Sequence, residues 1–138
     1  LMLVTRRARA LGAFLQNADG ENLLQGFKRA NNIVTQAEQN DGVEYSYGAD
    51  IKFAETDEER DLFLALETNQ PSIKRAIKVQ DFNLAMESLA SLRPSVDGFF
   101  EAVQVNADKQ IVRRNRLNIL SRMRSVCLEI ADFSQIEG

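Results

Sequence analysis

The sequence predicts an all-α protein, a helical bundle of five or six helices. Two observations predict it: apolar residues recur three and four positions apart along most of the chain, and residues that cap helices precede several of these segments. No segment reads firmly as a strand. With 138 residues, of which 44% are apolar and 27% charged, the chain is long enough to bury a core as one domain.

The first third of the chain predicts two helices and a loop. Residues 2–16, rich in alanine and leucine, predict a helix that ends at a break over residues 17–20. A second helix is expected over residues 21–39. Residues 40–55 lack a helical period, so we expect a surface loop there, with a short extended piece at residues 43–47.

A capping box predicts where the third helix begins. The hydroxyl of Thr56 and the carboxylate of Glu59 can each accept a hydrogen bond from a free amide of the first turn. We expect this helix to run to about Asn69, and we expect Pro71 to open or kink a continuation that ends near Val79.

Three more helix signals complete the chain. Asp81 is the expected N-cap of a fourth helix that ends near Leu92, and Pro94 suits the first turn of a fifth. Phe99 and Phe100 of the fifth helix are expected in the core. The last helix is expected over residues 109–132. Its apolar stripe comprises Ile119, Met123, Val126 and Ile130.

Residue types that are missing exclude several kinds of chemistry. The sequence has no histidine, which removes imidazole bases and ligands, and Cys127 alone can form neither a zinc site nor an internal disulfide. No apolar run approaches the roughly 20 residues of a membrane span, so we expect a cytoplasmic protein without a membrane partner. We expect one domain over residues 1–138, cut from a longer chain, with residues 1–18 belonging partly to the preceding region.

The charges are segregated along the chain. Residues 38–67 hold ten of the twenty acidic residues, whereas residues 109–124 hold six basic residues and no acidic one. A basic last helix can bind the phosphates of a polyanion, because each guanidinium offers several donors and stays protonated. The candidates are Arg113, Arg114, Arg116, Arg122 and Arg124. The alternative is that these arginines cover the apolar stripe or pair with the acids of residues 55–67.

A second group of candidates lies on the polar face of the helix at residues 21–39. Lys28 and Arg29 could bind phosphates, and the carboxamide of Asn32 could contact a sugar or a base edge. A plain hydrophilic helix face is the alternative. In the loop that follows, Tyr45 and Tyr47 could stack on unpaired bases or pack on the domain itself. The residues alone thus indicate a non-catalytic binding or interaction domain.

Four stretches resemble one family. They are LRPSVDGFFEAVQVNAD from Leu92, RRNRLNILSRMR from Arg113, IADFS from Ile130 and FKRANNI from Phe27. Their pattern is similar to the C-terminal region of bacterial glycyl-tRNA synthetase β subunits, which belongs to the DALR-type anticodon-binding domains. Gly98 departs from the family's usual alanine and should weaken the start of the fifth helix.

The resemblance implies a division of labour. An α subunit would form the adenylate from glycine and ATP, with ATP and magnesium bound there, while the β subunit holds the glycine tRNA within a hetero-oligomer. This region would have no active site or cofactor of its own and would grip the anticodon stem-loop. Glycine anticodons end in two cytosines, whose amines need acceptors. The alternatives are a helical protein–protein interaction or bracing module, and an arginyl- or cysteinyl-type synthetase domain.

Overall fold

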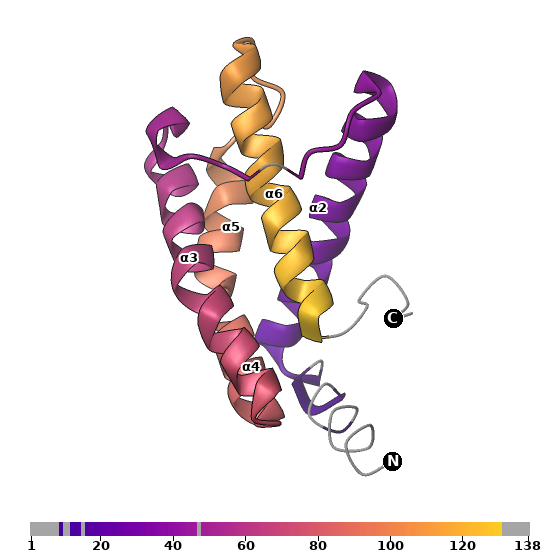
Figure 1. Ribbon diagram of the computed structural model, residues 1–138, viewed down its shortest axis with the longest axis vertical. Coiled ribbons are helices and arrows are strands. Elements are labelled where there is room, and N and C mark those ends of the chain that lie inside the picture. Colours follow the sequence, from indigo (N-terminus) through magenta and orange to yellow (C-terminus); the bar gives the residue numbers. More distant parts are fainter. Residues whose placement is uncertain (1–8, 10–11, 15, 47, 131–138) are drawn as a thin grey trace.

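The computed structural model describes residues 9, 12–14, 16–46 and 48–130, and over these residues the fold is helical without a strand (Figure 1). The expected all-α class is therefore confirmed. The elements are α2 (Ala18–Asp41), the short 3₁₀ helix η1 (Ile51–Phe53), α3 (Asp57–Lys78), α4 (Phe82–Ala90), α5 (Arg93–Ala102) and α6 (Gln110–Ile130). Most of the helix expected over residues 2–16, Tyr47 and the IADFS stretch after Ile130 lie outside the described residues.

The last helix is the centre of the bundle. Figure 1 shows α6 running between α2 and α3, with α5 behind it and α4 at the far end of α3. The stripe expected on α6 is confirmed, because Ile119, Met123 and Val126 are buried, while the side chain of Ile130 lies outside the described residues. None of the described helices is both long and apolar enough to cross a membrane.

The start of α2 differs from the expectation. Asn17 was expected in a break before Glu21, but it is the N-cap, and its Oδ1 accepts a hydrogen bond from the amide of Gly20 at 2.8 Å. Asparagine has a strong preference for this position, so the residues that suggest a break also begin a helix. At the other end, Gly42 terminates α2 with a left-handed backbone (φ 68°), which glycine adopts readily.

Pro71 does not interrupt the third helix. α3 runs through it from Asp57 to Lys78, so the expected opening at Pro71 is wrong. Proline lacks an N–H, which leaves the carbonyl of Glu67 without its usual helical donor. The buried side chains of Leu66 and Ile73 on either side hold the helix to the core, and this burial outweighs the missing hydrogen bond.

The expected caps of α3 and α4 are present, with one correction. Thr56 accepts a hydrogen bond from the amide of Glu59 at 3.1 Å, and Asp81 accepts one from the amide of Leu84 at 3.1 Å. However, the carboxylate of Glu59 binds the hydroxyl of Thr56 and no amide of the first turn. The carboxylate points into the interior of the protein, where it pairs with Arg116 of α6.

The linker between α2 and η1 crosses the outer side of α6 (Figure 1). Two contacts hold it there: the amide of Tyr45 donates to Glu38 Oε2 at 3.0 Å, and the amide of Asp50 donates to Asn115 Oδ1 at 2.8 Å. We refer to this linker, residues 42–50, together with the side of α6 that it crosses as the linker face.

Candidate nucleic-acid interface

Arg113 belongs to a three-residue polar cluster where the end of α2 meets α6. Its Nη1 lies 2.8 Å from Asp41 Oδ2 and 3.3 Å from the hydroxyl of Tyr45, and that hydroxyl donates to the same carboxylate. The hydrogen bonds from Tyr45 and Arg113 lower the pKa of Asp41. Burial and the hydrogen bond to Asp41 raise the pKa of Tyr45. Tyr45 is thus packed on the domain itself, the second of its two expected roles.

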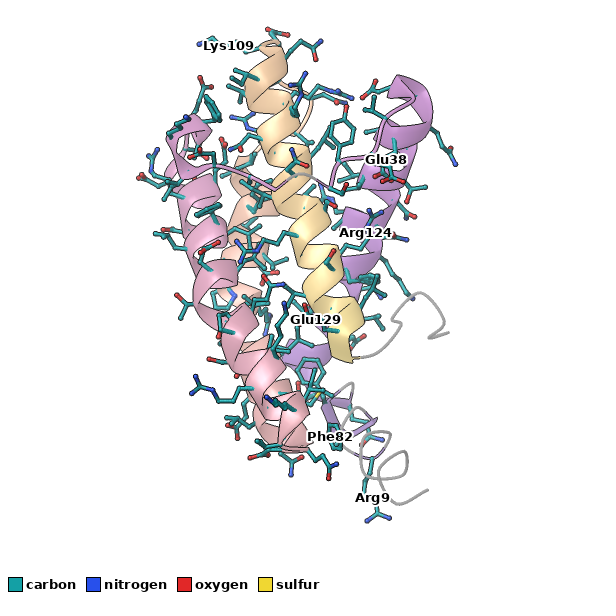
Figure 2. All side chains as sticks on the ribbon, viewed as in Figure 1. Arg9, Glu38, Phe82, Lys109, Arg124 and Glu129 are labelled. Atoms are coloured by element: carbon teal, nitrogen blue, oxygen red, sulfur yellow. The ribbon has the colours of Figure 1, made fainter. Side chains whose placement is uncertain are left out.

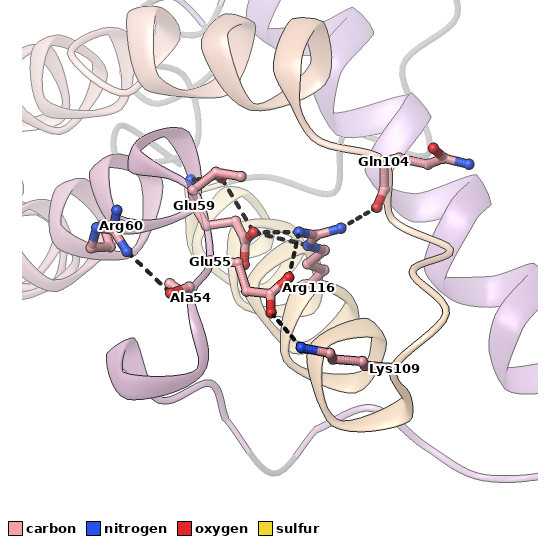
Figure 3. Close-up of polar contacts among 8 residues, drawn as sticks. Ala54, Glu55, Glu59, Arg60, Gln104, Lys109 and Arg116 are labelled. Carbon is pink, nitrogen blue, oxygen red and sulfur yellow. Dashed lines mark hydrogen bonds and ion pairs between the residues drawn. The ribbon is translucent and has the colours of Figure 1, made fainter.

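Arg116 forms the most buried ion pair of the described residues. Its Nη2 lies 2.7 Å from Glu59 Oε1 and its Nε 2.9 Å from the same oxygen, while Nη1 donates to the carbonyl of Gln104 at 2.6 Å (Figure 3). Glu59 is fully buried and the Arg116 side chain is 9% exposed. All three guanidinium nitrogens are engaged, so this geometry suits a role in holding α6 to the start of α3.

Arg122 and Arg124 extend to opposite sides of α6. Arg122 pairs with Glu67 of α3, and its Nε donates to Gln70 Oε1 at 2.9 Å. Arg124 turns toward α2, where Nη2 lies 3.7 Å from Glu38 Oε2 (Figure 2). Both side chains stay partly exposed, at 22% and 19%. A phosphate could therefore compete with either carboxylate.

Arg114 differs from the other arginines of α6. It is exposed, and none of the described residues forms an ion pair or hydrogen bond with it. It lies on the linker face beside Gln110 and Asn118. Of the five candidates on α6, it is the one whose donors no described residue engages.

Arg29, one of the candidates on α2, does not continue the row of candidates on α6. Arg29 stacks on the ring of Phe100 of α5, with 4.5 Å between its Cζ and the ring centroid. Asn31, two positions on and so about 200° around the helix, lies 3.4 Å from Arg124. Arg29 therefore lies on the α5 side of α2, away from the seam with α6. Lys28 is half-buried and Asn32 is exposed on the remaining polar face.

The linker face contains polar residues that the sequence reasoning did not select. Asn115, Asn118 and Ser121 of α6 are buried beside the linker, since Asn115 accepts a hydrogen bond from the amide of Asp50 and the other two share a pocket with Tyr45 and Gly48. Two pockets of about 220 and 370 Å³ open here, and both are lined by Tyr45 and Asn118. The three-residue spacing of Asn115, Asn118 and Ser121, which puts uncharged polar side chains on one side of the basic helix α6, is the signal that could have indicated this surface.

The remaining chemistry-bearing groups offer no reactive site. Burial raises the pKa of the Cys127 thiol to about 12, so it is not a nucleophile at neutral pH. Among the residues that the structure describes, no group of three acidic or cysteine side chains could hold a metal ion. Of the acids expected to cap α3, Asp57 pairs with Arg60 at 2.7 Å. These groups serve local structure.

This helical bundle, with a polar face and no reactive group in its described part, has the character of a binding domain. The model of the DALR anticodon binding domain matches residues 23–133, and the chain belongs to this family. Its expected family membership is therefore confirmed. That match covers α2 from Leu23 onward and all of α3 to α6, including the linker face.

Relatives with a more specific name match the whole chain. It is 64% identical over 138 residues to the glycine–tRNA ligase beta subunit of Dinoroseobacter shibae, 60% to that of Cereibacter sphaeroides and 42% over 139 aligned positions to that of Rhodospirillum centenum. All of the chain is covered in each comparison, but only 19% or 20% of the relative. The chain thus spans about a fifth of the length of these proteins.

Proposed function

We propose that this domain binds the anticodon stem-loop of glycine tRNA as the C-terminal part of a glycine–tRNA ligase β subunit. The observation that carries the proposal is the family match over residues 23–133, joined to 64% identity along the whole chain with a protein of that name. The domain would contribute binding and orientation, while an α subunit forms the adenylate with ATP and magnesium. The reaction would take place in the cytoplasm.

Binding would combine phosphate contacts with contacts to unpaired bases. The accessible cations Lys28, Arg29 and Arg114 can bind phosphates without breaking an ion pair of the described residues. Arg113, Arg122 and Arg124 would have to exchange a carboxylate for a phosphate, a smaller net gain. Asn32 remains a candidate for a sugar or base contact on the exposed face of α2.

A titration of labelled tRNA with the 138-residue chain, at two salt concentrations, tests this function. We expect glycine tRNA to bind more tightly than a tRNA for another amino acid, and we expect both affinities to fall as salt increases, because phosphate contacts release counterions. Equal, weak binding to both tRNAs would indicate charge attraction alone and would contradict the proposal.

The alternative is a helical module that braces the β subunit or binds a protein. The observation that favours it is that four of the five α6 arginines are engaged by acids of α2 and α3. The same titration separates the two functions. Absence of binding to either tRNA, by a chain whose circular dichroism shows intact helices, would support the bracing module.

A further inference from the structure

The larger pocket of the linker face, about 370 Å³, contains Arg114, a cation that no described residue engages, together with polar groups suited to a nucleobase. It is bounded by Tyr45 and Gly48 of the linker and by Arg114 and Asn118 of α6. It also contains one acid, the exposed Glu44. In the smaller pocket, by contrast, the cation is Arg122, which Glu67 already engages. The larger pocket is therefore the one that can bind an additional anion.

Asn118 contributes a buried side-chain oxygen to this pocket, and no described residue donates a hydrogen bond to that oxygen. The residue is 6% exposed, and its side-chain oxygen is fully buried without a hydrogen bond from any described residue. A buried acceptor without a donor is destabilising and uncommon in folded proteins. Because Asn118 lines both pockets, a donor brought by a ligand would satisfy it.

We propose that the carboxamide of Asn118 recognises an unpaired nucleobase that carries an exocyclic amine, with Arg114 binding an adjoining phosphate. The inference rests on the proposed function and adds the residue that distinguishes bases. A carboxamide matches the edge of such a base, since its oxygen accepts from the amine and its NH₂ donates to the neighbouring ring nitrogen. Under the proposed function this base is one of the two cytosines that end a glycine anticodon.

Access to Asn118 requires only local movement. The terminal torsion of asparagine has a broad energy profile, so the carboxamide can turn toward either pocket. The linker above it is held by the contacts of Tyr45 and Asp50 near its two ends. Between them Gly48 has a positive φ of 90°, a conformation that glycine adopts at little cost. A base can therefore enter beside the linker while its ends stay attached to α2 and α6.

The test compares natural glycine tRNA with tRNAs in which one of the two cytosines is replaced by uracil, which has a carbonyl in place of the amine. We expect the unmodified chain to lose about 10-fold or more in affinity for one of the two replaced tRNAs. Asn118→Leu should bind natural tRNA about as weakly as the unmodified chain binds the replaced tRNA. It should no longer distinguish that cytosine from uracil. Asn83→Ala, an exposed asparagine on α4, is the matched control and should behave like the unmodified chain.

The outcomes separate the inference from the function on which it rests. If Asn118→Leu retains the full preference for cytosine, the inference is overturned and the proposed function stands. If the unmodified chain does not prefer glycine tRNA over another tRNA, both fail. Asn118→Leu should also raise Tm, because it removes an unpaired buried polar group. Should the leucine not fit, Asn118→Ala removes the same carboxamide without added volume. Its affinities for natural tRNA and for the tRNA with uracil are then compared in the same way.

Discussion

At the scale of single residues, Glu59 and Arg116 form a buried ion pair next to the core. A carboxylate that is fully buried is stable only with a charged partner and further hydrogen bonds. Arg116 supplies the charge, and the hydroxyl of Thr56 supplies one hydrogen bond at 3.2 Å. The pair therefore joins the first turn of α3 to α6, and removing Arg116 would leave the carboxylate of Glu59 buried without a cation.

We expect Arg116→Ala to affect mainly stability and Arg114→Ala mainly tRNA binding, although the two arginines are only two positions apart. Arg116→Ala should lower the free energy of unfolding by about 3–5 kcal/mol, because it strands Glu59. Arg114→Ala should change it by less than about 0.5 kcal/mol, as for other exposed positions, and should weaken tRNA binding. Urea denaturation and the tRNA titration measure the two effects. Equal stability of the two variants would contradict the roles assigned here.

Cys127 makes a prediction about alkaline pH. Its pKa is raised from an ordinary 9.0 to about 12 by burial, so between these values the folded thiol keeps its proton while the unfolded one loses it. The unfolded state then binds fewer protons, and stability falls as pH rises, by up to about 1.4 kcal/mol per pH unit. Urea denaturation from about pH 8 to about pH 11 measures this slope.

The control for that experiment is Cys127→Ala, which removes the thiol while other groups continue to titrate. Its stability should fall less steeply with pH than that of the unmodified chain. Parallel slopes for the two proteins would mean that the thiol ionises equally in the folded and unfolded states, contrary to its complete burial.

At the scale of helices, two glycines distinguish close packing from open space. Gly26 of α2 faces α5 so closely that an added Cβ would lie 2.9 Å from Val96 Cγ1, and valine has little rotamer freedom with which to yield. Around Gly98 of α5 the nearest atom, Glu58 Cγ, would lie 3.9 Å away, an ordinary contact. Gly26 is thus required by the approach of α2 to α5, whereas Gly98 is not required by packing.

Alanine substitutions at these two glycines should therefore change stability in opposite directions. Gly98→Ala should raise the free energy of unfolding by about 0.5–1 kcal/mol, because alanine loses less backbone entropy in a helix. Gly26→Ala should lower it by about 1–3 kcal/mol through overpacking. Thermal melts followed by circular dichroism measure both. Stabilisation by Gly26→Ala would show that α2 and α5 are farther apart than described.

Helices were predictable from the sequence where local chemistry decides them. The cap at Thr56 and the apolar stripe of α6 depend only on residues within a few positions along the chain, and the sequence predicted both. The helix opening expected at Pro71 is wrong because contacts of α3 with distant parts of the chain outweigh a local preference against helix. The linker could not be placed, since a segment without periodicity contains no signal for the surface that it crosses.

At the scale of the whole molecule, the segregated charges largely neutralise one another within the fold. Acids of residues 38–67 contact the arginines of α6, at Asp41, Glu38, Glu59 and Glu67. Pairing with residues 55–67 was the alternative that the sequence left open beside phosphate binding, and it holds for Glu59 and Glu67, whereas Asp41 and Glu38 lie outside that segment. Charge in the sequence could therefore predict that α6 is polar, but not which arginine keeps free donors, because that depends on the packing of α2 and α3 against it.

The contacts proposed for Arg114 and Asn118 place RNA on the linker face. Amide hydrogen exchange of the 138-residue chain, with and without an anticodon stem-loop of glycine tRNA, tests it most directly. We expect exchange to slow in residues 42–50 and around Arg114 and Asn118, and to stay unchanged on α4, which lies at the far end of α3. Slowing confined to α4 and the adjoining end of α3 would place the RNA elsewhere and would contradict the claim.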